Sequence, residues 1–467
     1  MKKTRIVATI GPASDSKENM RKIVEAGVNV FRLNFSHGTH KTHQNIIDLA
    51  KELRTEIKRP LGILADLQGP RIRVGNAEPF EIEKGEIIFV SDKRATDEKE
   101  LIIDSDGVVS SLQIGERILV EDGLMKFVVV EKLENSVRAE VLNGGTIKPR
   151  KGMNLPDTKL TFGAVTEKDK LDLEFALKNE VDFVALSFVS NAQEVLETRE
   201  SMKKFLGRQD SLPQIIVKVE RKEAIDNIDE IITATDVVMV ARGDLGIEMA
   251  ESKVILYQKE IIAKCLQAAK TVIVATQMLD SMINNPIPTR AEVSDVTNAV
   301  IDHTDAVMLS GESASGKYPI EAVATMTQII SDTEESPFDD INEHFEHIIY
   351  SDYASIMCSA HEMAINSDAK AIVLFSESGV SARMMAHHRP EQMMLVGTHN
   401  PKTYNQMSIV WGARAYFFET QDREELVDTM ININKEAGRL SAGDKVIVIL
   451  GRVPKGKDIA LVGIRIV

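Results

Sequence analysis

The chain has 467 residues, of which 43% are hydrophobic and 27% charged. At about 150 residues per domain, this length predicts roughly three globular domains, and the composition excludes a disordered, collagen-like or coiled-coil protein. Basic residues number 56 and acidic residues 71, and the resulting net charge of −15 argues against nucleic acid or an anionic membrane as a partner.

The first two-thirds of the chain alternates between short apolar runs and segments of helical periodicity. The segments Ser16–Ala26, Thr42–Ile57, Glu167–Lys178, Ala192–Phe205 and Leu256–Ala269 carry the helical spacing. The runs predict eight strands: Thr4–Gly11, Val28–Ser36, Leu61–Gln68, Val181–Val189, Gln214–Glu220, Asp236–Gly246, Thr271–Gln277 and Asp305–Glu312. This pattern predicts the α/β fold class and a (β/α)₈ TIM barrel over residues 1–69 and 168–340, with its chemistry at the carboxyl ends of the strands.

Strand signals without helices interrupt the barrel after its third strand. They fall at Glu86–Val90, Glu100–Asp104, Arg117–Glu121, Met125–Lys132 and Ser136–Leu142. We predict a small all-β domain, a β-barrel, inserted over residues 70–167. Its position places it over the barrel mouth as a lid.

A third domain is expected over residues 341–467. A helical segment, Tyr353–Asn366, leads into five predicted strands: Ala371–Ser376, Met393–Thr398, Ala413–Phe418, Lys445–Leu450 and Ile459–Ile466. Helices between them indicate a separate α/β domain.

Charged residues end two predicted barrel strands that are otherwise apolar. Lys218 and Glu220 are two residues apart and therefore point the same way, and the buried run before them makes a solvent-facing pair hard to place. Asp244 ends the next strand. Two carboxylates with substrate oxygens and water suit Mg²⁺, whereas the alternative for Asp244 is a helix cap.

Polar residues also alternate along the second predicted strand, where Arg32, Asn34 and Ser36 share one face. Arg32 could bind a phosphate or carboxylate through a bidentate fork, or form a buried ion pair within the barrel mouth. Arg73 and Lys151 are further cations that we expect to converge on this mouth, which favours the phosphate interpretation.

Two other motifs carry less weight. Thr276 closes the seventh strand, but a threonine in that place is usually a cap. The stretch Gly311–Lys317 has the spacing of a P-loop, yet Tyr318 replaces the hydroxyl residue that would bind Mg²⁺. We therefore interpret it as a loop after the eighth strand.

The C-terminal domain offers a candidate effector site. A hydroxyl-rich turn between a strand and a helix could cradle a phosphate through Ser376, Ser378, Gly379 and Ser381. The basic glycine loop Gly451–Lys457 could complete it, although ordinary caps and a mobile loop explain both features equally well.

Five motifs, in this order along the chain, resemble the pyruvate kinase family: FRLNFSHG (Phe31–Gly38), KVER (Lys218–Arg221), MVARGDLGIE (Met239–Glu248), ATQMLDSM (Ala275–Met282) and PTRAEVSDVTNAV (Pro288–Val300). The resemblance runs from Thr4 to the C-terminus and is to members without the extra C-terminal phosphotransfer-like domain. It implies a glycolytic phosphotransferase that converts phosphoenolpyruvate and ADP to pyruvate and ATP through a Mg-stabilised enolate that is then protonated.

The resemblance also implies residue roles. Arg32 would bind the phosphate that is transferred. Lys218 would stabilise the phosphoryl group and the enolate. Thr276 would lie near the proton that is delivered to the enolate. Glu220 and Asp244 would hold Mg²⁺ or Mn²⁺, and Gly243, Asp244 and Thr276 would bind the substrate carboxylate. The nucleotide-side positions implied in the same way are Asn34, Ser36, His37, Arg73 and Lys151.

Two departures from the family pattern lead to hypotheses. Asn34, Ser36 and Asp66 match a monovalent-cation site, but Leu67 replaces a threonine ligand and Arg71 replaces a glutamate. A guanidinium there could take over the charge of K⁺, so we expect no K⁺ requirement. Glu377 occupies a position where members that respond to fructose 1,6-bisphosphate can carry lysine, so we expect that this activator does not bind.

Two rival functions share part of this pattern. Barrel lyases and aldolases that stabilise a pyruvate enolate on Mg²⁺ would explain Arg32, Glu220 and Asp244, but not the lid or Lys218. A non-catalytic regulatory paralogue predicts lost catalytic residues, and these are present. A reaction that depends on ADP would exclude the lyases and aldolases, and any turnover would exclude the non-catalytic paralogue.

The remaining expectations concern compartment and assembly. Cys265 and Cys358 lie in apolar, helix-like stretches and are expected to be buried thiols, which fits a reducing cytoplasm. The sequence shows neither a signal peptide nor a membrane span. The resemblance implies a homotetramer with a phosphorylated allosteric effector.

Overall fold

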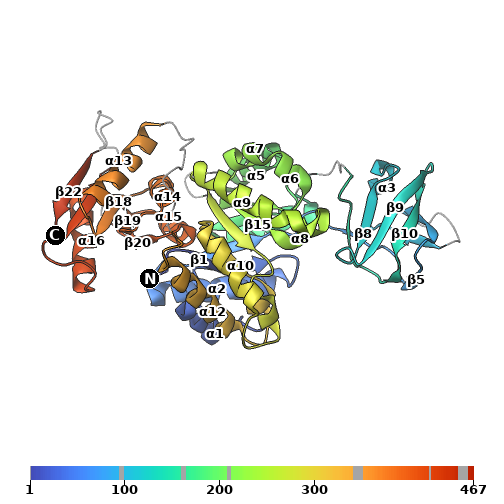
Figure 1. Cartoon of the computed structure of the whole chain (residues 1–467), viewed down its shortest axis with the longest axis horizontal. Helices are drawn as coiled ribbons and strands as arrows, with labels where there is room; N and C mark the ends of the chain where they lie inside the picture. The colour runs from blue at the N-terminus through green and yellow to red at the C-terminus, as the bar shows by residue number, and fades with distance from the viewer. Residues whose placement is uncertain are drawn as a thin grey trace.

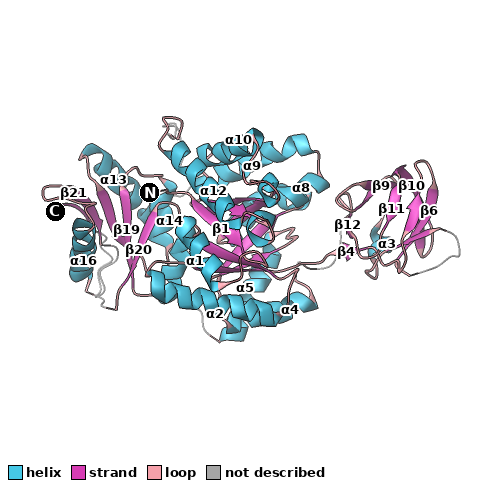
Figure 2. Cartoon of the chain, turned by 90° about the horizontal axis from the view of Figure 1, so that it is seen from below, coloured by secondary structure: helices cyan, strands magenta, loops and turns pink. Residues whose placement is uncertain are grey.

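The computed structural model describes residues 2–93, 99–158, 163, 165–207, 212–339, 351–419, 422–450 and 461–467. Three bodies follow one another along its longest axis (Figure 1). The central one is a barrel, with the inserted domain on one side and the C-terminal domain on the other. The view turned by 90° shows the same order and the helices that surround the barrel strands (Figure 2).

Eight parallel strands close the central barrel in the order β1-β17-β16-β15-β14-β13-β3-β2. They are β1 (Arg5–Thr9), β2 (Val30–Asn34), β3 (Gly62–Asp66), β13 (Phe183–Leu186), β14 (Gln214–Val219), β15 (Val237–Ala241), β16 (Thr271–Ala275) and β17 (Ala306–Leu309). The predicted TIM barrel is confirmed. Each strand is buried along nearly its whole length, which explains the continuous apolar runs in the sequence.

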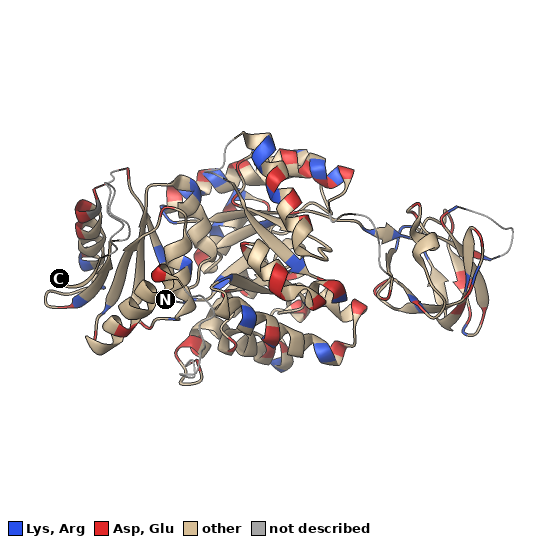
Figure 3. Cartoon of the chain, turned by 90° about the horizontal axis from the view of Figure 1, so that it is seen from above, with Lys and Arg blue, Asp and Glu red and all other residues tan. Residues whose placement is uncertain are grey.

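The helices around the barrel begin at hydrogen-bonding side chains. Thr39, Thr166 and Thr289 each form a capping box with the third residue of the helix that follows, which fixes where that helix starts. The barrel helices are α1 (Lys17–Ala26), α2 (His40–Ile57), α4 (Glu167–Lys178), α5 (Ala192–Leu206), α6 (Lys222–Asp226), α7 (Ile228–Ala234), α8 (Arg242–Glu248), α9 (Glu251–Gln267), α10 (Arg290–Ile301), α11 (Gly311–Ala314) and α12 (Pro319–Glu334), with a 3₁₀ turn at Asp280–Ile283. Acidic and basic residues are interspersed along these helices (Figure 3).

Two predicted strands run into helices. β17 stops at Leu309, and Gly311 and Glu312, expected to belong to it, lie in α11. β15 stops at Ala241, and the residues expected to extend it to Gly246 form the first turns of α8 instead. Asp244 therefore lies in the first turn of a helix, where a carboxylate is favoured by the exposed backbone N–H groups. Asp244 still lies at the carboxyl end of the barrel, because α8 follows β15 directly.

The inserted domain is built mainly from a seven-stranded sheet in the order β4-β12-β8-β9-β10-β6-β7. A bridge between Val74 and Ile103 joins its two edges, so the sheet closes on itself as the predicted β-barrel does. Its elements are β4 (Ile72–Arg73), β5 (Phe80–Ile82), β6 (Ile87–Ser91), β7 (Glu100–Ile102), α3 (Val108–Ser111), β8 (Arg117–Val120), β9 (Met125–Lys132), β10 (Ser136–Asn143), β11 (Gly145–Ile147) and β12 (Gly152–Asn154). It has its own core, in which Phe127 is fully buried.

The C-terminal domain contains a five-stranded sheet in the order β20-β19-β18-β21-β22, in which only the β21–β22 pair is antiparallel. Its strands are β18 (Ala371–Phe375), β19 (Met393–Thr398), β20 (Ala413–Phe417), β21 (Lys445–Ile449) and β22 (Val462–Ile466). Its helices are α13 (Asp352–Asn366), α14 (Val380–His387), α15 (Pro401–Gln406) and α16 (Arg423–Glu436), with a 3₁₀ turn at Met407–Ile409. The expected α/β domain is confirmed.

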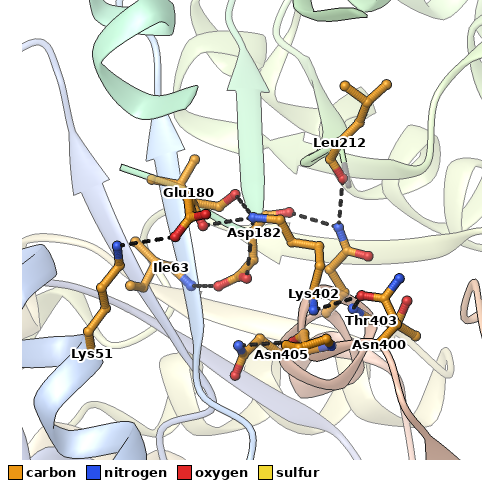
Figure 4. Close-up of polar contacts among 12 residues, drawn as sticks. Lys51, Ile63, Glu180, Asp182, Leu212, Asn400, Lys402, Thr403 and Asn405 are labelled. Atoms are coloured by element: carbon orange, nitrogen blue, oxygen red, sulfur yellow. Dashed lines mark hydrogen bonds and ion pairs between the residues drawn. The ribbon is translucent and has the colours of Figure 1, made fainter. Parts of the chain in front are cut away.

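Helix α15 fixes this domain to the floor of the barrel (Figure 4). Lys402 Nζ lies 2.7 Å from the carbonyl oxygen of Glu180 and 2.6 Å from that of Val181. Gln406 Nε2 donates to the carbonyl oxygens of Asp182 and Leu212 at 3.2 and 3.1 Å. Carbonyl groups at the amino ends of barrel strands therefore accept hydrogen bonds from side chains of the C-terminal domain.

The two cysteines differ in how deeply they are buried. Cys265 is fully buried on α9, and burial raises the pKa of its thiol. Cys358 is only half-buried, so the prediction for it is wrong. The buried face of α13 is formed by Met357, Ala360 and Ala364, and Cys358 follows the first of these at the edge of that face.

Among the described residues, no helix is both long and apolar enough to cross a membrane.

Candidate active site

Two barrel strands bring Arg32 and Asp66 together. Arg32 lies on β2 and donates from Nε to Asp66 Oδ2 on β3 at 2.7 Å, and from Nη1 to Thr9 Oγ1 on β1 at 2.9 Å. Arg32 is 8% exposed and Asp66 only 1%. The predicted alternative for Arg32, a buried ion pair, is therefore present, and it leaves the guanidinium fixed at the carboxyl end of the barrel.

Lys218 on β14 joins the same group. Its Nζ lies 2.7 Å from Glu220 Oε1 and 3.4 Å from Asp66 Oδ1, and it donates to Ser187 Oγ at 2.8 Å. Glu220 Oε2 in turn accepts from the backbone N–H of Phe188 at 2.8 Å. Lys218 and Glu220 do point the same way, as their spacing predicts. We call Arg32, Asp66, Lys218 and Glu220 the charge cluster.

The charge cluster shifts the pKa values of its members in different directions. Burial alone raises the pKa of Asp66, but Lys218 and Arg32 outweigh it and hold that pKa below the ordinary value. Burial likewise lowers the pKa of Lys218, and Asp66 and Glu220 outweigh it in the opposite direction. Burial raises the pKa of Glu220 to about 7, and the neighbouring charge of Asp244 adds to this.

A backbone turn places Thr276 beside the first turn of α8. Thr276 has a φ of 67° and Gln277 a φ of 53°, a left-handed conformation that is uncommon for these residues. The Gly243 N–H donates to Thr276 Oγ1 at 2.8 Å, and Arg242 Nη2 donates to the Thr276 carbonyl oxygen at 2.7 Å. Arg242 is itself paired with Asp295 at 2.7 Å. The turn after β16 is therefore held in place from two sides.

The residues after β2 turn back on themselves. Asn34 Oδ1 accepts from the Ser36 N–H at 3.1 Å, and His43 Nε2 lies 3.0 Å from the His37 carbonyl oxygen. Asn34 stands opposite Asp66 in the β2–β3 register. Leu67 is buried, and its carbonyl oxygen accepts from Ser187 Oγ at 2.8 Å.

The structure places Arg73 and Lys151 on the inserted domain. Arg73 Nη1 donates to the Arg150 carbonyl oxygen at 3.0 Å, and Lys151 pairs with Glu121. Figure 1 shows this domain at one side of the barrel, where Asn154 Nδ2 donates to Glu248 Oε1 of α8 at 3.1 Å.

The donor set fits a hard divalent cation. Glu220 is a carboxylate almost without solvent, and Asp244 is near enough to influence its charge. Within the described ranges, no group of three or more His, Cys, Asp and Glu side chains is arranged to hold a metal. Two carboxylates with substrate and water oxygens match the way Mg²⁺ is bound in phosphate chemistry.

The candidate effector turn in the C-terminal domain follows β18. Ser376 is 2% exposed, Gly379 has a φ of 80° at the start of α14, and Ser381 Oγ lies 3.0 Å from Tyr353 Oη. Glu377 Oε1 contacts His399 Nε2 at 2.7 Å. The glycine loop expected to complete this site, at residues 451–457, lies outside the described residues.

Comparison with known proteins decides the family. A family model described as "Pyruvate kinase, barrel domain" matches residues 1–323, and "Pyruvate kinase, alpha/beta domain" matches residues 354–462. The chain belongs to the pyruvate kinase family. Pyruvate kinases from Staphylococcus aureus strains MRSA252 and USA300 are each 40% identical over 466 residues, which is 98% of this chain and 79% of theirs. The crystal structure of a pyruvate kinase from Cryptosporidium parvum aligns with a TM-score of 0.92 and 33% identity, and it covers 99% of this chain and 96% of that one.

As a pyruvate kinase, the enzyme transfers the phosphoryl group of phosphoenolpyruvate to ADP and forms pyruvate and ATP. The family uses Mg²⁺ for this reaction. Sequence reasoning missed two partners of the charge cluster, Ser187 and Thr9. Both are polar residues at or just beyond the carboxyl end of an apolar strand, the same signal that identified Lys218.

Proposed function

We propose that the charge cluster carries out the phosphoryl transfer. Arg32 binds the phosphate of phosphoenolpyruvate, since its guanidinium is already oriented by Asp66 and Thr9. Lys218 lies between Asp66 and Glu220, and its ammonium group stabilises the phosphoryl group during transfer and the enolate oxygen that forms. A loose transition state needs placed charge more than covalent help, and this arrangement supplies that charge.

Glu220 and Asp244 are the residues that would hold Mg²⁺ or Mn²⁺. A bound divalent cation supplies positive charge to the substrate oxygens and favours the ionised form of Glu220. The observation that supports this role is the burial of Glu220, which raises its pKa to about 7. A cation beside such a carboxylate stabilises its ionised form.

Thr276 and the first turn of α8 bind the substrate carboxylate in this proposal. The Gly243 N–H donates to Thr276 Oγ1, and the Asp244 N–H is the next one in the same turn of α8. The Gly243–Thr276 hydrogen bond gives way to the ligand. Thr276 then stands near the carbon of the enolate that takes up a proton. The left-handed turn at Thr276 holds its hydroxyl near that carbon.

We assign ADP to the space between the barrel mouth and the inserted domain. Asn34, Ser36 and His37 contribute from the barrel, and Arg73 and Lys151 from the inserted domain. Closure of that domain brings the two cations to the nucleotide phosphates and excludes water. We accordingly propose the division 1–69 with 168–340 for the barrel, 70–167 for the lid and 341–467 for a regulatory domain.

We propose that turnover does not require K⁺. Leu67 offers no side-chain oxygen beside Asn34, Ser36 and Asp66. The exposed guanidinium of Arg71, just before β4, provides a permanent positive charge at the entrance to the inserted domain. We expect the rate with tetramethylammonium as the counter-ion to lie within about twofold of the rate with K⁺. Pyruvate formation with phosphoenolpyruvate, ADP and Mg²⁺ measures this.

The matched variant carries L67T and R71E. We expect it to lose most of its activity without K⁺ and to recover on addition of K⁺. A wild-type rate that collapses without K⁺ contradicts the role of Arg71, while leaving the phosphoryl transfer itself intact.

A phosphorylated effector at Ser376, Ser378, Gly379 and Ser381 is also proposed, with fructose 1,6-bisphosphate excluded. Glu377 places a carboxylate on this turn, in contact with His399, and that carboxylate repels the two phosphate groups of a bisphosphate. We expect no saturable heat when fructose 1,6-bisphosphate is titrated into the wild type by calorimetry. The E377K variant is the control, and tight binding by the wild type would overturn the exclusion.

Compartment and assembly complete the proposal. Cys265 and Cys358 carry free thiols, which suits a reducing cytoplasm. A homotetramer is proposed from family membership.

A further inference from the structure

The segment that leaves β3 for the inserted domain packs against the turn after β13. We call this segment, residues 67–69, the lid linker. The Leu67 N–H donates to the Ala185 carbonyl oxygen at 3.0 Å, and the Leu67 carbonyl oxygen accepts from Ser187 Oγ at 2.8 Å. A Cβ atom added to Gly69 would lie only 2.8 Å from Ser187 Cβ, so the linker and the turn are in close contact.

A buried carboxylate holds the lid linker from the other side. Asp169 has no exposed surface, and its Oδ1 accepts from the Gly69 N–H at 3.1 Å. Its Oδ2 accepts from the N–H and the Oγ1 of Thr166 at 2.9 and 2.5 Å. Thr166 caps α4, where the chain returns from the inserted domain to the barrel. The segments that enter and leave the inserted domain therefore meet at one carboxylate, and the lid linker is fixed on both sides.

Ser187 connects the lid linker to Lys218. Its side chain is 2% exposed, and its Oγ accepts from Lys218 Nζ at 2.8 Å and donates to the Leu67 carbonyl oxygen. The direction of both hydrogen bonds is fixed, because an ammonium group can only donate and a carbonyl oxygen can only accept. The single hydroxyl proton of Ser187 therefore points at the lid linker, and its oxygen faces Lys218.

The Lys218 ammonium group has three protons and, in the described part of the chain, three polar partners. Besides Ser187 Oγ at 2.8 Å, they are Glu220 Oε1 at 2.7 Å and Asp66 Oδ1 at 3.4 Å. Ser187 is the neutral one of the three. Attraction to the two carboxylates has little dependence on direction, whereas the hydrogen bond to Ser187 Oγ restricts the ammonium group to one orientation.

The turn after β13 also holds Glu220. Phe188 has a φ of 58°, a left-handed conformation that is an outlier for a bulky residue, and its N–H donates to Glu220 Oε2 at 2.8 Å. Strained backbone of this kind persists where the surrounding structure determines it, and it is frequent at functional sites. Two successive residues, Ser187 and Phe188, therefore hold two members of the charge cluster.

We propose that Ser187 is a positioning residue for the phosphoryl transfer, which fixes the Lys218 ammonium group and uses the lid linker as its anchor. The inference rests on the role proposed above for Lys218. During transfer the phosphoryl group takes over the N–H that faces Asp66, since that contact is the longest of the three, and Ser187 keeps a second N–H in place. Charge that is held in position before the reaction stabilises the transition state without reorganisation.

The test is steady-state pyruvate formation by Ser187→Ala with saturating ADP and Mg²⁺, accompanied by thermal melts. We expect kcat to fall by about 10- to 100-fold, because the ammonium group is no longer held where the phosphoryl group passes. The KM for phosphoenolpyruvate is expected to stay within about threefold of the wild type, since Asp66 and Thr9 orient Arg32 without Ser187.

A double variant with Lys218→Met separates positioning from a general structural role. If Ser187 acts through Lys218, adding Ser187→Ala to Lys218→Met changes kcat by no more than about twofold. A loss by the same factor in both backgrounds would overturn the proposal and leave the role of Lys218 intact. A Lys218→Met enzyme with wild-type kcat would instead refute the role of Lys218 itself, so the two failures are distinguishable.

Ser14→Ala is the matched control. Ser14 is fully buried in the loop after β1, at the same end of the barrel, and its Oγ accepts from the Gly11 N–H at 3.2 Å. We expect its kcat to stay within about twofold of the wild type. Ser187→Cys replaces the hydroxyl by a weaker hydrogen-bonding thiol, so its kcat should lie between those of the wild type and Ser187→Ala. It takes the place of the alanine variant if that variant does not fold. An unchanged kcat in the folded Ser187 variants would overturn the proposal.

Discussion

Replacing Lys218 by methionine is expected to lower kcat by about a thousandfold or more, because this removes the one ammonium group placed against the transferring phosphoryl group. Methionine keeps the length and the apolar stem of lysine. The loss is expected in kcat more than in the KM for phosphoenolpyruvate, since Arg32 still binds the phosphate. Steady-state pyruvate formation with saturating ADP and Mg²⁺ measures both parameters.

The same substitution leaves Asp66 and Glu220 without their shared cation, which lowers the free energy of unfolding by about 3 kcal/mol. Thermal melts must therefore accompany the kinetics. Lys402→Met is the matched control, because Lys402 is a largely buried lysine at the opposite end of the barrel, 3.8 Å from Asp182. A folded Lys218→Met enzyme with wild-type kcat would remove Lys218 from the chemistry.

Glu220→Gln is expected to raise the Mg²⁺ concentration for half-maximal rate by about 10- to 100-fold, because the amide keeps the shape of the carboxylate and loses its charge. It also removes the charge that faces Lys218 at 2.7 Å, so kcat falls as well. Titration of activity with Mg²⁺ and Mn²⁺ measures the first effect, and Mn²⁺ binding followed by electron paramagnetic resonance measures it without turnover.

Glu248→Gln is the control for this variant. Glu248 is another buried carboxylate whose pKa is raised by burial, and its Oε1 accepts from Asn154 of the inserted domain at 3.1 Å. We expect its Mg²⁺ dependence to match the wild type. If the Mg²⁺ dependence of Glu220→Gln equals that of the wild type, Glu220 is not a metal ligand.

The barrel could be predicted from the sequence because its strands are buried on both faces. In β14 the residues Ile215–Val217 are apolar and buried, and the polar residue that follows them, Lys218, marks the carboxyl end of the strand. Local composition therefore indicates both the fold and the place of its chemistry. The two-residue spacing of Lys218 and Glu220 predicts that they point the same way, and the structure adds that they form an ion pair.

Short elements were harder to predict. Strands β4, β5, β11 and β12 are two or three residues long, which is too short for an alternating pattern, and they exist because the rest of the inserted domain pairs with them. The change from strand to helix after Ala241 was missed for a related reason, since the apolar run continues into α8 through Leu245 and Ile247. The partners of Arg32 and Lys218 depend on which strands become neighbours, and the sequence does not state this order.

The central claim is that this chain moves a phosphoryl group from phosphoenolpyruvate to ADP by means of the charge cluster. Phosphorus NMR of the purified enzyme with phosphoenolpyruvate, ADP and Mg²⁺ tests it most directly, because the fate of the phosphorus is observed. We expect ATP to appear at the rate at which phosphoenolpyruvate disappears, no reaction without ADP, and a rate at least about a thousandfold lower in Lys218→Met. Inorganic phosphate in place of ATP, or consumption of phosphoenolpyruvate without ADP, would contradict the claim.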